Sequence, residues 1–356
     1  MTPYKFQLET RLMNLFQFEG SVLAGRARSL ICALLEEVAV GKPVLIPANI
    51  CTSVAISIIE AGAIPVAVPV SPETGLPTLE TLREVLDQSQ PGVWMIPHLY
   101  GFIQNYGVLV EEYRSKGWFI LENDTNAIRP KYNVGFQPDA SVLSFGYAKV
   151  IHAGGGGALL SDDLSLVKEI AQKVYHYPRH SVINQTMEEN VMIARRALRT
   201  GGDSPISNMS DLNQIFEVER QLVRFNWSDV WARNLEVALD GYDDEVAHRN
   251  MLKDLWDSAL HAFESNLVPV NLPQPIPWRL IRTVKDKRQV LLQELRRNGI
   301  DAGTNYGSLS KELPQNLIPT SAKDVWGGCV LNLWLDRNYS IDKIQKSSEI
   351  ISKVFS

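Results

Sequence analysis

The chain has 356 residues, of which 45% are hydrophobic and 21% are charged, and its net charge at pH 7 is −5. This length is enough for two domains with a substantial core. The charge is mild and shows no basic stripe, which argues against nucleic acid as a partner. The most apolar region, 53–70, is interrupted by Glu60, Pro65 and Pro69, so we do not expect it to span a bilayer.

The three cysteines, Cys32, Cys51 and Cys329, lie far apart and lack the spacing of a metal site. The N-terminal residues are charged throughout and contain no signal-type apolar segment. These features favour a reducing cytoplasm over a disulfide framework. They predict a cytoplasmic protein with no metal and no membrane partner.

From about Arg28 onward, short apolar strands alternate with amphipathic helices. Helices are expected over 27–39, 52–62, 79–88 and 106–117, and strands over 43–47, 64–70, 92–97 and 118–124. Two more strands, over 140–145 and 157–162, extend the same sheet. Continuous apolar strands separated by helices predict an α/β domain with a mainly parallel sheet, covered on both faces.

The last third of the chain has a different rhythm. After a helical region over 164–261, we expect a strand over 277–284, a helix over 287–299, a strand over 329–335 and a terminal helix over 340–355. This pattern predicts a small C-terminal α+β domain. We place the large domain at 1–245 and the small one at 246–356.

Lys149 stands between the strand predicted over 140–145 and a run of four glycines, Gly154–Gly157. Charged lysines are seldom buried without a partner, and glycines allow a backbone to turn at positive φ or to approach a ligand closely. A solvated lysine in a surface hairpin is the competing interpretation. The run lacks the G-x-G-x-x-G spacing of a nicotinamide site, and no G-K-[ST] follows it as in a P-loop.

Polar residues follow other strands of the predicted sheet in the same way. His98 follows the strand over 92–97, and Asp124 ends the segment over 118–124. In an open α/β sheet, ligands bind beyond the carboxyl ends of the strands. We therefore expect these side chains to gather with Lys149 along one edge.

The order of segments and three motifs together resemble the DegT/DnrJ/EryC1/StrS family of pyridoxal 5′-phosphate (PLP) sugar aminotransferases. The motifs are Ser144-Phe145 followed by Lys149 and the glycines, HLYG at 98–101, and GIDAGTNY at 299–306. The similarity extends from about Gly25 to Val354. It implies an aspartate-aminotransferase-like fold (PLP fold type I) for the large domain, with PLP as the cofactor.

The resemblance implies a role for each of several residues around PLP. Lys149 would hold the aldehyde of PLP as an imine and move a proton during the reaction. An anion would face the pyridine nitrogen, and we choose Asp124, although ungapped matching would put Asn123 there. A helix-capping or turn aspartate is the competing interpretation of Asp124.

The phosphate and substrate groups are assigned in the same way. Ser144 and the start of the first predicted helix, at Arg28 and Ser29, would bind the phosphate, although a serine is also common at a helix start. Asn226 resembles the asparagine that reaches the phosphate from a neighbouring subunit, and an exposed asparagine between helices is its alternative. His98 and Tyr306 would contact substrate, with a structural histidine as the alternative for His98.

The resemblance implies transfer of an amino group from an amino acid, with glutamate as the expected donor, to a nucleotide-linked keto-sugar, for surface polysaccharide or deoxyaminosugar biosynthesis. The resemblance also implies a homodimer with shared active sites. Two alternatives keep the fold: a dehydratase, whose relatives carry histidine in place of Lys149, and a non-catalytic or regulatory protein. Departures from the family pattern at Cys51 and Asn305 leave the second alternative open.

Overall fold

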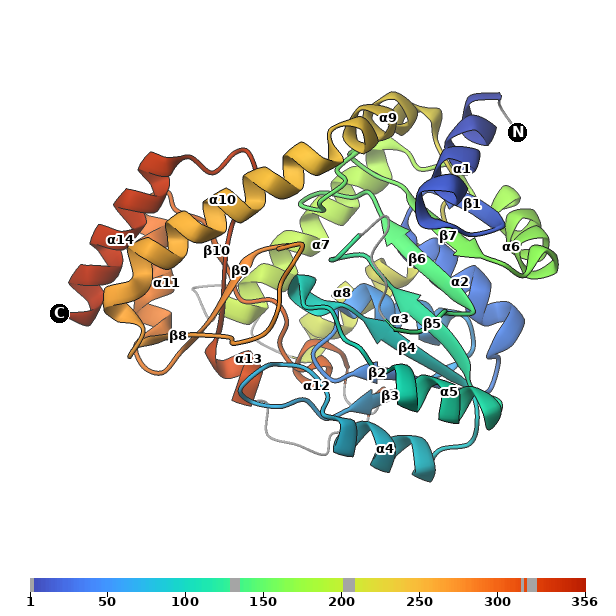
Figure 1. The fold of residues 1–356 in the computed structure, drawn as a ribbon, viewed down its shortest axis with the longest axis horizontal. Helices are drawn as coiled ribbons and strands as arrows, with labels where there is room; N and C mark the ends of the chain where they lie inside the picture. Colours follow the sequence, from blue (N-terminus) through green and yellow to red (C-terminus); the bar gives the residue numbers. More distant parts are fainter. Residues whose placement is uncertain (1–2, 129–134, 201–208, 315–316, 319–324) are drawn as a thin grey trace.

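The first part of the chain builds a seven-stranded sheet with its covering helices. The computed structural model describes residues 3–128, 135–200, 209–314, 317–318 and 325–356 (Figure 1). The strands of this sheet are β1 (Gly20–Ala24), β2 (Pro43–Pro47), β3 (Ile64–Val68), β4 (Val93–Pro97), β5 (Phe119–Asn123), β6 (Ala140–Ser144) and β7 (Gly157–Ser161). The helices between and before them are α1 (Pro3–Phe16), α2 (Ala27–Val38), α3 (Thr52–Glu60), α4 (Leu79–Gln88), the short η1 (Leu99–Gly101) and α5 (Gly107–Ser115).

The strand order is β1-β7-β6-β5-β4-β2-β3. The pairs from β3 through β6 are parallel, whereas β7 pairs antiparallel with both β6 and β1. The predicted α/β class and the mainly parallel sheet are therefore confirmed. The sequence analysis missed α1 and also β1, the antiparallel edge strand of this sheet.

Side chains along the strands alternate between two hydrophobic cores. On β2, Val44 and Ile46 belong to the core that contains α2 and α3, whereas Leu45 belongs to the core that contains α4 and α5. This alternation follows from the two-residue period of a strand. Because both faces are buried, the strands are apolar throughout, as expected for a parallel sheet.

The helical region predicted over 164–261 consists of several helices. They are α6 (Leu164–Tyr175), α7 (Val182–Thr200), α8 (Met209–Gln221), η2 (Asp229–Trp231), α9 (Ala232–Asp240) and α10 (Tyr242–Leu260). In Figure 1, α10 runs from the large sheet to the second part of the molecule. The domain boundary that we predict at 245/246 would fall inside α10.

The C-terminal part forms a second, four-stranded sheet of order β10-β11-β9-β8, with antiparallel pairs throughout. Its strands are β8 (Leu267–Pro269), β9 (Leu280–Val284), β10 (Ala302–Gly303) and β11 (Val330–Leu333). The remaining helices are η3 (His261–Phe263), α11 (Arg288–Arg297), α12 (Leu309–Glu312), α13 (Val325–Cys329) and α14 (Ile341–Phe355). Leucine and isoleucine side chains of α10, α11 and α14 form a separate core on this sheet.

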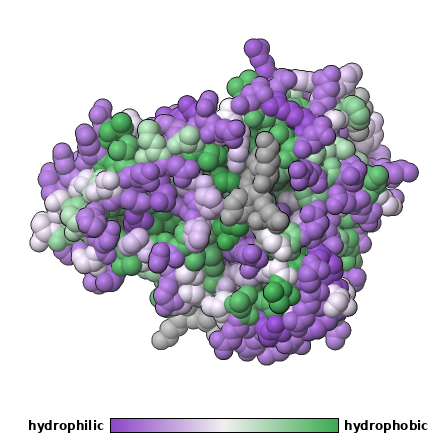
Figure 2. All heavy atoms as spheres, viewed as in Figure 1, coloured by the Kyte–Doolittle hydropathy of each residue, from purple (hydrophilic) through white to green (hydrophobic). Residues whose placement is uncertain are grey.

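Among the helices that the structure describes, none combines the length and the apolar character needed to cross a membrane. The face of the molecule in Figure 2 is mostly hydrophilic, and hydrophobic residues appear on it in scattered groups.

Candidate active site

The loop that carries Lys149 is held in place from both sides. Ala148, directly before it, has φ of 61°, a left-handed conformation that is costly for a residue with a Cβ atom. Trp278 Nε1 donates to the carbonyl oxygen of Ala148 (2.9 Å), and Arg249 Nη2 lies 3.5 Å from the carbonyl oxygen of Lys149. Two residues from the C-terminal part of the chain therefore stabilise this strained loop.

The glycine run after Lys149 packs against the start of α2 through Gly155, Gly156 and Gly157. Gly154 and Gly156 have φ of 86° and 90°, which a glycine adopts without steric cost. A Cβ atom on Gly157 would lie 2.7 Å from the backbone nitrogen of Ala27. Because the glycines have no side chains, the helix start can lie close to the Lys149 loop. This close approach explains the glycine run after the lysine.

A cavity of about 170 Å³ opens where these elements meet. Its polar lining comes from the start of α2, from the ends of β4, β5 and β6, and from the loops around Lys149 and Tyr306. Five residues predicted from the sequence line it: Arg28, His98, Ser144, Lys149 and Tyr306. No aspartate or glutamate is among its lining residues in the described part of the chain.

Lys149 is half-buried at the cavity wall, and its Nζ donates to Asn126 Oδ1 (2.8 Å). Burial lowers the pKa of Lys149 to about 8, because desolvation disfavours the charged amine. A larger share of the amine is then neutral near physiological pH than for an exposed lysine. A neutral amine is the nucleophilic form.

The start of α2 gives the cavity a basic wall. Arg26 and Arg28 flank the first residue of α2, and both pair with Glu188 of α7, Arg26 through Nη2 at 2.6 Å. His180 Nε2 also lies 3.1 Å from Glu188. Backbone N–H groups at the start of a helix favour anions. This end is therefore suited to a phosphate group.

The stability that Glu188 and its basic partners contribute should depend on pH. Burial would raise the pKa of Glu188, but His180 and the two arginines lower it to about 2, from 4.5 for an unperturbed group. The stabilisation is present above about pH 4.5 and is lost as the pH falls towards 2. We expect Glu188→Gln to lower the free energy of unfolding by about 2 kcal/mol at pH 7.

Urea denaturation between pH 2.5 and 7 measures this effect. The difference between wild type and Glu188→Gln should shrink as the pH falls below 4.5. Glu189→Gln, at an exposed neighbouring position of α7, is the control and should change stability little. A difference for Glu188→Gln that is independent of pH would contradict the prediction.

Asn123, rather than Asp124, lies on the cavity wall. Both residues are buried, with 2% of each surface exposed. Asn123 is the last residue of β5 and Asp124 follows it, and successive side chains of an extended chain point to opposite sides. The Asn123 amide contacts Met95 Sδ at 3.6 Å and accepts from Thr125 N–H at 3.4 Å. The position that ungapped matching gives for the anion, Asn123, thus carries a neutral amide at the cavity, whereas Asp124, our choice, is not among the lining residues.

His98 lines the cavity but is held by protein atoms on both ring nitrogens. The N–H of Gln104 donates to Nδ1 (3.1 Å), so the ring proton must be on Nε2, which lies 2.9 Å from Glu122 Oε1. His98 is also completely buried. The geometry fits a residue that shapes the cavity floor.

The structure does not bring Ser29 to the cavity. Its hydroxyl is fully buried, donates to the carbonyl oxygen of Val223 (2.7 Å) and accepts from the N–H of Phe225 (3.0 Å). This serine therefore ties α2 to the segment after α8. Asn226 does not line the cavity of its own chain either; its Nδ2 donates to the carbonyl oxygen of Tyr175 (3.2 Å).

Tyr306 belongs to an aromatic group that the sequence analysis did not identify. Its ring stacks on Trp278 with centroids 5.9 Å apart and an interplanar angle of 4°. Tyr100 Oη accepts from the Tyr306 N–H (3.0 Å) and from Trp326 Nε1 (2.8 Å). Only three-dimensional contacts show that Trp278 reaches the Lys149 loop.

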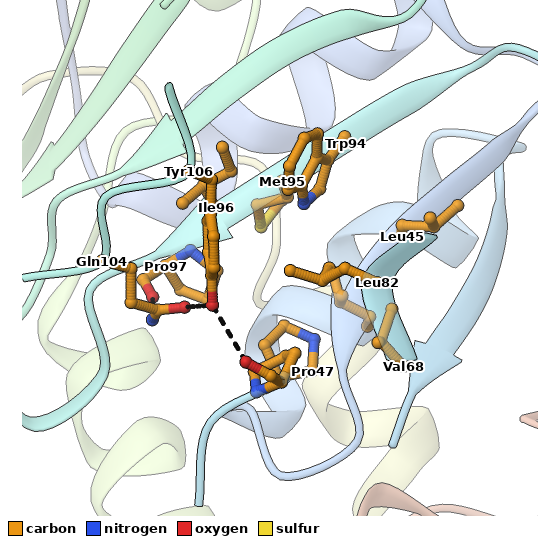
Figure 3. Close-up of a pocket in the computed structure, with 12 residues that line it drawn as sticks. Leu45, Pro47, Val68, Leu82, Trp94, Met95, Ile96, Pro97, Gln104 and Tyr106 are labelled. Carbon is orange, nitrogen blue, oxygen red and sulfur yellow. Dashed lines mark hydrogen bonds between the residues drawn. The ribbon is translucent and has the colours of Figure 1, made fainter. Parts of the chain in front are cut away.

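Another, much smaller space lies between β2, β3, β4 and α4 (Figure 3). Its volume is about 10 Å³, and apolar side chains such as Leu45, Leu82 and Trp94 line most of it. It has room for one water molecule at most. We treat it as part of the core on the far face of the sheet.

Comparison with known proteins links this site to a family. A model of the DegT/DnrJ/EryC1/StrS aminotransferase family matches residues 3–325. The GDP-perosamine synthase of Escherichia coli O157:H7 is 26% identical over 165 residues, which are 46% of this chain and 45% of that protein. The match thus spans less than half the length of this curated relative.

Solved structures share the fold across the whole chain. A DegT DnrJ EryC1 StrS aminotransferase from Brucella abortus superposes with a TM-score of 0.75 at 18% identity, covering 99% of this chain and 90% of that one. The PLP-form of Spr1654 from Streptococcus pneumoniae, described as a putative sugar aminotransferase, gives a TM-score of 0.74 at 20% identity, covering 100% and 93%. The predicted fold type is confirmed.

Proposed function

Since the chain belongs to the DegT/DnrJ/EryC1/StrS aminotransferase family, we propose that it is a PLP-dependent aminotransferase for nucleotide-linked keto-sugars. Glutamate is the proposed amino donor, and the products are an amino sugar and a 2-keto acid. The observation that carries this proposal is Lys149, a half-buried amine on the wall of a cavity that Arg26 and Arg28 also line. The named relative, a GDP-perosamine synthase, supports a sugar nucleotide as the acceptor.

The residues of the cavity fit PLP at two of its three ends. Lys149 offers an amine with a lowered pKa for the aldehyde, and Arg28, Ser144 and the start of α2 offer charge, a hydroxyl and N–H groups for the phosphate. When bound, PLP supplies an aldehyde that receives the amino group and a ring that withdraws electrons. The third end carries Asn123 in place of a carboxylate.

Each of these residues has a definite task in the proposed reaction. The Nζ of Lys149 would hold the aldehyde of PLP, and the same amine would act as the base and acid that moves a proton of the donor. Its hydrogen bond to Asn126 and the support of its loop by Trp278 orient the amine. Tyr306, stacked on the same tryptophan, also lines the cavity and would contact the substrate.

Amino transfer itself is the experiment that tests this proposal. Purified protein is incubated with PLP, glutamate and a panel of keto-sugar nucleotides, and the products are analysed by mass. An amino sugar nucleotide together with 2-oxoglutarate is the expected result. Loss of water from the sugar without a gain of nitrogen would favour the dehydratase alternative.

We also propose a homodimer in which a second copy covers α7. Four apolar residues on this helix are strongly exposed: Val182 (80%), Ile183 (73%), Met192 (54%) and Ile193 (67%). An exposed apolar surface of this kind favours association. Asn226, which lies beside Tyr175 just before this helix, would then reach the phosphate of the partner.

Sedimentation of the purified protein tests whether it is a dimer. We expect wild type to sediment as a dimer and Ile193→Glu as a monomer with little activity. Val108→Glu, at an exposed position of α5, is the control, and this variant should stay dimeric. A wild-type monomer that remains active at low concentration would rule out shared active sites. The cytoplasmic location stays a prediction.

A further inference from the structure

The turn that ends at Lys149 holds an alanine where its backbone geometry favours glycine. Residues 146–149 form this turn, and the N–H of Lys149 closes it by donating to the carbonyl oxygen of Gly146 (3.3 Å). Ala148, the third residue of the turn, has φ of 61°. A positive φ at this position is usually taken by glycine or asparagine. Alanine keeps such a conformation when contacts from outside the turn stabilise it.

Trp278 provides a contact of this kind. Its Nε1–H donates to the carbonyl oxygen of Ala148 (2.9 Å), and only 3% of its surface is exposed. This carbonyl belongs to the peptide group that joins Ala148 to Lys149, so the hydrogen bond acts directly on the backbone before the lysine. The same indole lies beside the amine, since Lys149 Nζ is 5.8 Å from the ring centroid. Trp278 therefore lies against both ends of the Lys149 side chain.

Trp278 is itself held by two other segments. Its backbone N–H donates to the carbonyl oxygen of Tyr100 (3.3 Å), and its own carbonyl oxygen accepts from Arg249 Nη1 (2.8 Å). A Cβ atom on Gly101 would clash with the carbonyl oxygen of Ile276 and lie 3.0 Å from the nitrogen of Trp278. The glycine of the HLYG motif thus lets the chain around Trp278 approach this turn.

Arg249 joins the backbone of Trp278 to the lysine. It is a buried residue of α10, and its Nε donates to Glu245 (2.7 Å). Its Nη2 lies 3.5 Å from the carbonyl oxygen of Lys149. One guanidinium therefore lies between the carbonyl groups of Trp278 and Lys149. Because α10 runs between the two parts of the molecule (Figure 1), its packing also fixes the place of Trp278 against the Lys149 loop.

Trp334 shows that a tryptophan in this region does not need its N–H for packing. Its ring packs against Tyr147, with centroids 6.1 Å apart. Its Nε1 is closed to solvent and has no hydrogen-bonding partner within the part of the chain that the structure describes. Trp278 differs because its N–H is used on the Lys149 loop. Trp334 is therefore a matched control for the loss of an indole N–H.

We propose that Trp278 is a positioning residue for Lys149: its indole N–H holds Ala148 in the left-handed conformation, and this conformation directs the amine into the cavity. The inference rests on the role of Lys149 in the proposed function. Trp278 itself takes no part in bonds that form or break. A lysine amine held in one direction meets an aldehyde in a reactive geometry more often than a freely moving amine does.

The rate at which the apoprotein captures PLP tests the inference without any amino donor. The visible absorbance after mixing at pH 8 gives the second-order rate constant, and borohydride reduction with peptide mapping shows whether Lys149 carries the cofactor. Trp278→Phe keeps an aromatic ring but loses the N–H. It should lower the rate constant about 3- to 10-fold, the effect of one hydrogen bond. Trp334→Phe should capture PLP like wild type.

A second substitution separates positioning from a general loss of stability. Glycine adopts a positive φ without steric cost, so Ala148→Gly should make the turn less dependent on Trp278. Adding Trp278→Phe to Ala148→Gly should therefore change the rate constant by less than about twofold. An equal loss with and without Ala148→Gly would overturn the proposal. So would a lower melting temperature of Trp278→Phe with an unchanged rate constant.

If Trp278→Phe does not fold, 3-benzothienylalanine in place of Trp278 decides. This analogue keeps two fused rings of the same shape and has sulfur where the indole has its N–H. It should lower the rate constant by the same factor, and an unchanged rate constant would overturn the proposal.

Failure of the proposed function would look different. Wild type that captures PLP on Lys149, with the expected loss in Trp278→Phe, yet aminates no keto-sugar would overturn the amino transfer alone. Wild type that aminates a sugar, with a capture rate that Trp278→Phe leaves unchanged, would overturn the positioning role alone. Wild type that never carries PLP on Lys149 would overturn both.

Discussion

Lys149→Ala is expected to lower the rate of amino transfer by at least about 10³-fold, because the variant loses both the covalent link to the cofactor and the group that moves the proton. Borohydride reduction of wild type with PLP should fix the cofactor to the peptide that contains Lys149. The apoprotein should capture PLP faster as the pH rises through about 8, where the amine becomes neutral. An exposed lysine would show this rise near its ordinary pKa, above pH 10.

Two controls separate this effect from misfolding. Lys149→Ala should unfold at no lower urea concentration than wild type, because burial disfavours the charged amine that it removes. Lys168→Ala, at an exposed position of α6, should keep full activity and the label on Lys149. Label on another lysine would contradict the assigned role.

The second large effect concerns the neighbours Asn123 and Asp124. Because Asn123 lines the cavity and Asp124 does not, we expect Asn123→Ala to slow the reaction with glutamate by about ten- to a hundredfold, equivalent to one or two hydrogen bonds. Asp124→Asn should change this rate by less than about threefold. Stopped-flow absorbance of the bound cofactor after mixing with glutamate measures both.

Asn123→Asp gives a readout that does not depend on activity. A carboxylate at this wall would favour a protonated ring nitrogen, whereas the natural amide does not. The absorption spectrum of the bound cofactor and its dependence on pH should therefore differ between wild type and Asn123→Asp. If Asp124→Asn proved the damaging change and Asn123→Ala nearly neutral, the preference for Asp124 that we drew from the sequence would stand instead.

Local patterns predicted most of the large domain. The apolar runs at β2 to β5 and the amphipathic helices between them fix the parallel sheet, because each pattern is contained in a few consecutive residues. β1 escaped prediction since its five residues pair with distant β7, and β10 has only two residues. Such short edges depend on tertiary pairing, which a periodic pattern does not reveal.

The residues of the candidate site also differ in how far the local sequence predicts them. Lys149, Ser144 and His98 follow strands or precede glycines, so the sequence placed them at the cavity, where the structure also finds them. Which of Asn123 and Asp124 faces the cavity depends on the exact end of a strand, where a shift of one residue reverses the side chain. Nothing local indicates that Ser29 binds backbone groups of the segment after α8.

The most direct test of the central claim follows the absorbance of the PLP-loaded protein through both halves of the reaction. Glutamate alone should abolish the visible absorption of the lysine-bound cofactor and release one equivalent of 2-oxoglutarate. A suitable keto-sugar nucleotide, added after removal of glutamate, should restore the absorption as the amino sugar forms. An unchanged spectrum with every amino acid tried, in a protein that still binds PLP at Lys149, would contradict amino transfer and favour a non-catalytic member of the fold.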